Sequence, residues 1–251
     1  MVFVLPDLSS AVFWAALWKI IVANIILSGD NAVVIAMACH NLSDKYRRPA
    51  IMFGSAGAIV LRIVFCAVIG YLLSVPYLKL VGGALLLWIG IKLLVEEEED
   101  ANIKAHDNIW AAIWTIIVAD AVMSLDNAIA IAAAAKGDFT LIIIGLVISI
   151  PIIIVGATLI STVLDRFPWL GLVGAGLIGW IAGEIMAGEG RIEQVDASGK
   201  LVEVVRPGTI AAWLDATIPH AEITCAAFGT GLVIVVGLFL ARRHARHAEK
   251  S

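Results

Sequence analysis

Seven long runs of apolar residues constrain this chain of 251 residues more than any other feature. A helix needs roughly 20 mostly apolar residues to cross the hydrocarbon core of a bilayer, and each run is long enough. Charged residues or prolines separate the runs, so each run predicts one membrane crossing. The predicted spans are 12–39, 50–74, 77–95, 108–135, 139–161, 169–187 and 222–241.

The composition agrees with a membrane protein and excludes most other classes. Hydrophobic residues make up 61% of the chain and charged residues 15%, a balance that one soluble core cannot hide. The net charge of −4 lacks the excess of positive charge that is typical of proteins that bind nucleic acid. The sequence contains no nucleophile elbow, no HExxH and no P-loop motif, so we expect neither an enzyme nor an ATP-driven pump, and no required cofactor. Its three cysteines form no CxxC pair and are expected to be small buried hydrophobes.

The positive-inside rule predicts the orientation of the spans. Basic residues gather in the loop after the first span and again after the last span. Seven crossings place both groups on the same side of the membrane, which is then the cytoplasmic side. The N-terminus is therefore expected outside and the C-terminus in the cytoplasm. The basic residues are Lys45, Arg47 and Arg48 in the first loop, and Arg242, Arg243, Arg246 and Lys250 after the last span.

The longest loop, 188–221, is then extracytoplasmic. Apolar and polar residues alternate over 191–196 and again over 201–205, which predicts a small β-hairpin. Residues 208–218 predict a short amphipathic helix. This loop could be a solvated lid, or it could form a surface that binds a metal or a partner. No motif in the loop favours binding.

An internal repeat is the strongest signal in the sequence. Residues 20–39 are identical to residues 116–135 at 11 of 20 positions, with a constant offset of 96. Residues 81–89 resemble residues 173–181 at an offset of 92. The apolar composition of membrane helices explains shared leucine and alanine, but it does not explain a shared Ser-x-Asp-Asn-Ala motif.

The repeat predicts how the spans are arranged. Three spans over 10–95 recur as three spans over 108–187, and because three is odd the second copy crosses in the opposite direction. Residues 222–241 add a seventh helix. The predicted fold is therefore one transmembrane domain over 1–251, an all-α polytopic membrane protein with a 3+3 inverted repeat plus one helix. Transporters with such repeats hold their substrates near the midplane, where the two copies meet.

Polar residues inside the spans are the candidate functional residues. A charged side chain at the centre of a bilayer costs about 2.5–3.5 kcal/mol, so each one needs a reason to be there. The charged residues well inside the spans are Asp30, Asp120, Asp126, Glu184 and Arg62. Residues seven apart share a helical face, so the first and fourth spans are polar over a wide arc. The accompanying polar residues are Asn24, Asn31, Asn127, Ser28 and Ser124.

Nearly all of these groups are oxygen donors, and all five histidines fall in loops or at helix ends. Oxygen ligands without imidazole or thiolate suit Mn²⁺, Mg²⁺ or Ca²⁺. The recurrence of the motif favours Asp30 and Asp126 as metal ligands. The alternative is interhelical hydrogen bonding around a buried ion pair, in which Arg62 balances the charge of Asp120, Asp126 or Glu184.

The two motifs Ser28-Gly-Asp-Asn31-Ala and Ser124-Leu-Asp-Asn127-Ala resemble those of the TerC family of integral membrane proteins. The resemblance covers about residues 10–241, and it extends to the LysE exporter superfamily in its inverted repeat. It implies export of Mn²⁺, or of a related divalent cation, across a bacterial inner membrane. The metal residues that it implies are Asp30, Asn31, Asp126 and Asn127, with Asp120 and Glu184 matched only by local context.

We therefore expect a secondary transporter that exports Mn²⁺, with Ca²⁺ or Mg²⁺ as alternatives, by alternating access. A LysE-like exporter of small solutes and a non-transporting membrane assembly or metalation factor are the rival functions. The expected partners are the lipid bilayer and divalent metal ions. The sequence does not decide whether the protein forms a homo-oligomer.

Overall fold

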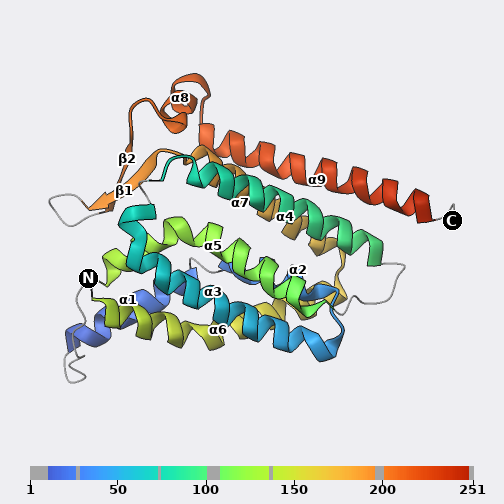
Figure 1. The fold of residues 1–251 in the computed structure, drawn as a ribbon, viewed down its shortest axis with the longest axis horizontal. Helices are drawn as coiled ribbons and strands as arrows, with labels where there is room; N and C mark the ends of the chain where they lie inside the picture. The colour runs from blue at the N-terminus through green and yellow to red at the C-terminus, as the bar shows by residue number, and fades with distance from the viewer. Residues whose placement is uncertain are drawn as a thin grey trace.

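Long apolar helices run roughly side by side along the molecule in the computed structural model (Figure 1). The structure describes residues 11–26, 29–72, 75–100, 108–135, 138–195 and 201–248. Its helices are α1 (Ala11–Ile26), α2 (Gly29–His40), α3 (Asp44–Leu72), α4 (Leu78–Asp100), α5 (Ile109–Ala134), α6 (Phe139–Arg166), α7 (Trp169–Ala187), α8 (Ile210–Thr217) and α9 (Ala221–Ala248). Its strands are β1 (Arg191–Val195) and β2 (Leu201–Val205).

Five stretches of helix are long and apolar enough to cross a membrane, and they lie in α3, α4, α6, α7 and α9. Shorter apolar stretches, Phe13–Val22 and Ile109–Leu125, lie in α1 and α5. The protein is therefore a polytopic, mainly helical membrane protein. The predicted first span corresponds to α1 and α2, and the two residues between these helices lie outside the described residues.

Two helix boundaries differ from the predicted spans. The loop before the second span was expected to run to Pro49, but α3 begins at Asp44 and includes this proline. Near the start of a helix a proline sacrifices at most one backbone hydrogen bond, which solvent can replace at an exposed end. The acidic run 96–100 was expected to end the third span, and the apolar stretch Leu78–Glu96 does end at its first residue, although the helix α4 continues to Asp100. Glutamate is a good helix former, so a helix can continue through such a run once it has left the apolar region.

The helices form two groups around two apolar cores. Figure 1 shows α4, α7 and α9 on one side of the bundle and α1, α3 and α6 on the other. Ile20, Ile116 and Ile142 lie in the core of the second group. Leu86 and Ile178 lie in the core of the first group. Because α2 and α5 contribute buried residues to both cores, these two helices form the centre of the molecule.

The contacts between the helices are reciprocal. Helix α3 packs on α5, whereas α6 packs on α1 and α2, and α4 packs on α7. Gly54 and Gly145 permit the first two of these contacts. A Cβ atom at Gly54 would lie 2.6 Å from Cδ1 of Ile116, and a Cβ atom at Gly145 would lie 2.5 Å from Cγ2 of Ile20. Ile20 and Ile116 are equivalent positions at the offset of 96.

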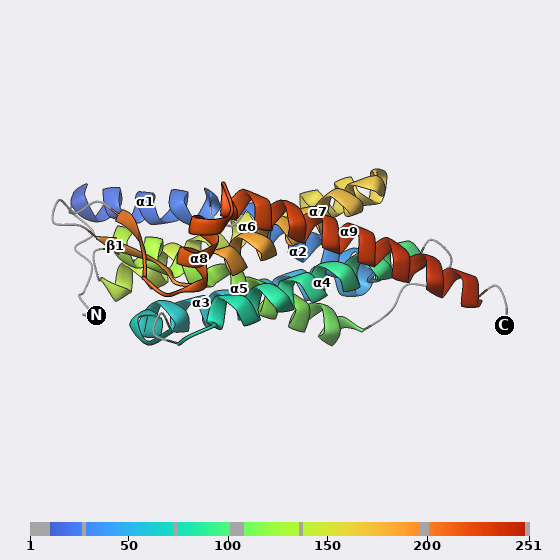
Figure 2. The same ribbon diagram turned by 90° about the horizontal axis from the view of Figure 1, so that it is seen from above.

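Strands β1 and β2 and helix α8 lie together at one end of the bundle, beside the start of α9 (Figure 2). The strands pair antiparallel, with Arg191 opposite Val205 and Val195 opposite Leu201. The alternating segments of the sequence thus form the predicted hairpin, and Ile210–Thr217 forms the predicted short helix. Arg191 of the hairpin forms ion pairs with Asp215 of α8 and Glu222 of α9, and it also lines a cavity between the hairpin and the helices.

Candidate functional site

Arg62 projects from α3 into a buried polar cluster between α1 and α5. Only 1% of the Arg62 side chain is exposed. Its guanidinium donates to Ser124 Oγ at 2.8 Å, to Asn24 Oδ1 at 2.7 Å and to Asp120 Oδ1 at 2.5 Å. Ser124 Oγ also donates to Asp120 Oδ2 at 3.0 Å. A buried charge is tolerated only when its partners satisfy it, and Arg62 and Asp120 meet this requirement together. The sequence left three acids open as the partner of Arg62, and among the described side chains the ion pair is with Asp120.

The cluster lies where the two halves of the sequence meet. Asn24 and Asp120 are equivalent positions at the offset of 96, and the guanidinium of Arg62 bridges them. Asn31 joins from α2, because its Nδ2 donates to Asp120 Oδ1 at 2.9 Å. Asp120 therefore accepts from three side chains, and its charge is already neutralised by Arg62.

A cavity of about 340 Å³ brings together a different set of the predicted residues. Asp30 of α2, Asn127 of α5 and Glu184 of α7 all line it. We call it the acidic cavity, because Glu203 and Glu222 line it as well. Two basic residues, Lys79 and Arg191, complete its charged lining. The sequence pattern found three residues of this cavity but not those from the hairpin and from the start of α9.

Asn31 is hydrogen-bonded both to the buried cluster and to a residue of the acidic cavity. Its side-chain amide donates to Asp120, and its backbone N–H donates to Asp30 Oδ1 at 2.9 Å. The residue is 3% exposed, and within the described part of the chain its Oδ1 atom has no hydrogen-bond partner. A buried acceptor without a partner costs roughly 1–3 kcal/mol, so such an atom marks a place where a cation or a water would be stabilised.

The predicted metal residues thus divide into two groups. Asp120 lies with Arg62, whereas Asp30, Asn127 and Glu184 lie around the acidic cavity. Ser28 lies outside the described residues, and so does the side chain of Asp126, although its backbone is part of α5. Within the described residues, no three His, Cys, Asp or Glu side chains lie close enough to hold one metal ion.

A second cavity, of about 280 Å³, lies toward the other end of the same helices. Its polar lining residues are Asn41, Lys92, Glu96, Asn108 and Thr115. Along α5, Ala119 comes between Thr115 of this cavity and Met123 of the acidic cavity. Buried apolar residues occupy the corresponding levels of α2 and α4. The apolar layer between the two cavities is formed by Val34, Leu86 and Ala119.

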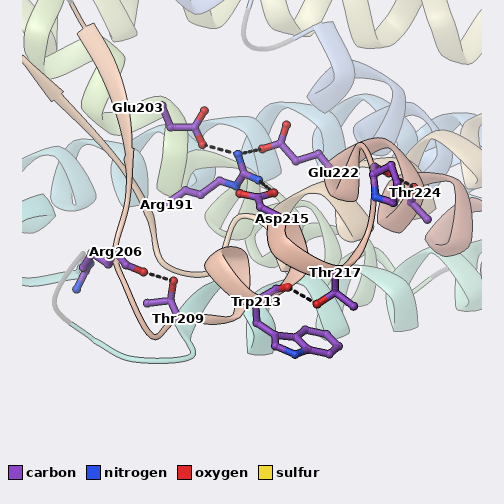
Figure 3. Close-up of polar contacts among 10 residues, drawn as sticks. Arg191, Glu203, Arg206, Thr209, Trp213, Asp215, Thr217, Glu222 and Thr224 are labelled. Carbon is purple, nitrogen blue, oxygen red and sulfur yellow. Dashed lines mark hydrogen bonds and ion pairs between the residues drawn. The ribbon is translucent and has the colours of Figure 1, made fainter.

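Arg191 lines the acidic cavity from the hairpin, and its guanidinium lies among three carboxylates (Figure 3). Its guanidinium contacts Glu203 at 3.2 Å, Asp215 at 2.5 Å and Glu222 at 2.9 Å. Partial burial alone would lower the pKa of Arg191, but the hydrogen bond to Glu203 and the charges of Glu222 and Asp215 raise it above its usual value. No sequence signal distinguishes Arg191 from Arg206, the other arginine of this loop.

Comparison with known proteins gives a family for the chain. Residues 9–245 match the family described as "Integral membrane protein TerC family". The uncharacterized membrane protein YjbE of Bacillus subtilis is 40% identical over 209 residues, which cover 83% of this chain and 96% of YjbE. YceF of the same organism is 28% identical over 70% of this chain and 72% of its own length. The inner membrane protein YoaE of Escherichia coli is 26% identical over 46% of this chain and 26% of its own length. No solved structure matches.

Proposed function

Since the chain belongs to the TerC family of integral membrane proteins, we propose that it is a secondary transporter that exports divalent cations. Mn²⁺ is the proposed substrate, with Ca²⁺ and Mg²⁺ as alternatives. The protein crosses a bacterial inner membrane seven times, with its N-terminus outside and its C-terminus in the cytoplasm. The location is supported by YoaE, which is named an inner membrane protein.

The reciprocal contacts support an inverted repeat in this proposal. Each half contributes a second helix that packs on the first helix of the other half, as α3 does on α5 and α6 does on α1 and α2. Ile20 and Ile116, which are equivalent at the offset of 96, each pack against a glycine of the other half, Gly145 and Gly54. Two halves that exchange helices in this way can rock against each other about a fixed central site, which is how repeat-built transporters expose a site to one side at a time.

The unpartnered Oδ1 of Asn31 carries the proposal. It is a buried neutral oxygen of the residue whose backbone N–H donates to the carboxylate of Asp30, and Asp30 lines the same cavity as Asn127 and Glu184. Carboxylate and amide oxygens are ligands that hard divalent cations prefer. We assign the cation to Asp30, Asn31 and Asn127, with Asp126 and Glu184 completing the ligands during transport. Asp120 supplies no free charge in this state, since Arg62 neutralises it.

Alternating access requires a barrier that the ion crosses, and the apolar layer of Val34, Leu86 and Ala119 meets this requirement. The cavity with Glu96 and Thr115 is the cytoplasmic vestibule, and the acidic cavity is the release side. An apolar barrier opposes a hydrated cation strongly, because the ion would lose its water without gaining ligands.

Replacing Asp30 with asparagine tests the proposal. We expect Mn²⁺ flux into inside-out proteoliposomes to fall at least about tenfold, since even an outer-shell partner of a metal ligand is worth that much. The measurement is uptake of radiolabelled Mn²⁺ by the wild-type protein and the variant, repeated with Ca²⁺, Mg²⁺ and Zn²⁺. Asp165→Asn is the matched control, because Asp165 pairs with Arg47 and His40 outside the cavity and its loss should leave the flux unchanged.

The outcomes separate the three functions. Flux of Mn²⁺ that depends on Asp30 supports the proposal. Counterflow of labelled lysine without metal flux would favour a small-solute exporter of the LysE kind. If neither cation nor solute moves in vesicles that hold folded wild-type protein, the transporter assignment fails and an assembly or metalation factor takes its place.

A further inference from the structure

One side chain of the hairpin, that of Arg191, joins it to α8 and α9 beside the acidic cavity. Arg191 belongs to β1, Glu203 to β2, Asp215 to α8 and Glu222 to α9, so one guanidinium joins four elements (Figure 3). The Arg191 side chain is 14% exposed, although the hairpin itself lies at the end of the bundle. We call Arg191 and its three acidic partners the clasp.

The three contacts of the clasp differ in whether they must break when the hairpin moves away from the acidic cavity. The contact with Glu203 lies within the hairpin, because β1 and β2 are paired strands, and it persists when the hairpin moves as a unit. The contacts with Asp215 and Glu222 connect the hairpin to α8 and α9. These two contacts must break for the hairpin to leave the cavity, together with the hydrogen bond that Lys79 Nζ of α4 donates to the backbone oxygen of Arg191 at 3.3 Å.

Three of the four clasp residues line the acidic cavity. Arg191, Glu203 and Glu222 line the acidic cavity, whereas Asp215 is absent from its lining. The cavity also contains Asp30 and Asn127, which come from the centre of the bundle. A path from these residues to the end of the bundle therefore passes the guanidinium of Arg191.

We propose that the clasp is the outer gate of the acidic cavity, with Arg191 as the gating residue and Asp215 as the residue that positions it. While the gate is closed, Arg191 neutralises Glu203 and Glu222 and excludes other cations from them by charge repulsion. When the contacts with Asp215 and Glu222 break, the carboxylate of Glu222 becomes free at the mouth of the cavity and attracts a departing cation. The transport role of the gate rests on the proposed function, but its opening does not.

Thiol labelling tests the gate without measuring transport. Met123 lines the acidic cavity and is buried, so Met123→Cys is the reporter, in a Cys225→Ser background in which Cys39 and Cys66 are buried. The probe is a charged, membrane-impermeant maleimide added to purified full-length protein. In the Arg191→Gln variant we expect labelling roughly tenfold faster, because two partly exposed ion pairs hold the gate.

Matched variants distinguish a gate from general loosening. Asp215→Asn and Glu222→Gln should each speed labelling several-fold, whereas Glu203→Gln removes the contact inside the hairpin and should change it little. Asp215→Asn should add nothing to Arg191→Gln, because Asp215 acts through Arg191. A second reporter, Thr115→Cys in the other cavity, should be insensitive to all of these changes.

Three results would overturn the proposal. They are unchanged labelling of Met123→Cys in Arg191→Gln, equal acceleration at Thr115→Cys, and additive effects of Asp215→Asn and Arg191→Gln. A protein that moves no metal but shows the expected labelling would retain its gate and lose only the proposed function.

Discussion

Arg62→Gln should prevent the protein from accumulating in the membrane in a folded form. The variant leaves the carboxylate of Asp120 buried without its charge partner, while glutamine supplies too few donors to replace the guanidinium at Asn24, Ser124 and Asp120. Breaking one side of a buried ion pair costs about 3–5 kcal/mol, which is a large part of the stability of most proteins. Thermal unfolding in detergent, followed by size-exclusion chromatography, measures the loss.

The double variant Arg62→Gln/Asp120→Asn provides the control. It removes both charges together, and two amides can still hydrogen-bond to one another and to Asn31. We expect it to regain at least half of the lost stability, because the uncompensated charge has gone. A single variant as stable as the wild type, or a double variant no better than the single, would show that the ion pair does not hold this region together.

Gly183→Ala should separate α7 from α9 and destabilise the protein by roughly 1–3 kcal/mol. Small residues recur at every fourth position of α7, at Gly171, Ala175, Gly179 and Gly183. A methyl group at Gly183 would overlap the backbone carbonyl of Cys225, and one at Gly179 would lie 2.6 Å from the carbonyl oxygen of Gly229. Since the obstacle is backbone, no change of side-chain rotamer can relieve it.

Gly231→Ala is the matched control for this change. Gly231 belongs to α9 as well, but nothing lies within 4 Å of a Cβ atom built there. Alanine favours the helix over glycine by up to about 1 kcal/mol, so this variant should be as stable as the wild type or slightly more stable. Both variants can be compared by their midpoints of thermal unfolding, and equal midpoints would show that the close approach of α7 and α9 contributes nothing.

Much of the fold could be predicted from the sequence, because the bilayer imposes a length on each helix. The sixth span, 169–187, matches α7 at both ends, since Pro168 precedes it and Gly188 follows it. Pro49 misled the prediction of where α3 begins, because a helix can tolerate the loss of one backbone hydrogen bond near its exposed start. The acidic run does mark the end of the apolar stretch of α4 at Glu96, but a polar segment can end a span without ending the helix.

The candidate site was less predictable, because periodicity gives the face of a helix but not its rotation against neighbours. Asp120, Asp126 and Glu184 were equivalent candidates as partners of Arg62. The packing of α3 on α5 favours the two acids of α5 over Glu184 of α7, and among the described side chains the ion pair is with Asp120. Asp30 and Glu184 line one cavity because α2 and α7 both reach it. The contribution of Arg191 could not be foreseen, since a loop has no periodicity that would direct a side chain toward a cavity.

The exchange of helices between the two halves also decides the order in which the protein can assemble during synthesis. Helix α3 emerges from the ribosome before α5, which is its main packing partner, and α1 and α2 emerge long before α6. The first three helices are therefore made before their packing partners, and they have no complete core of their own. Arg62 is likewise made before Asp120, with which it forms its ion pair. Any machinery that inserts this chain must therefore accommodate the charge of Arg62 in the membrane before Asp120 has been made.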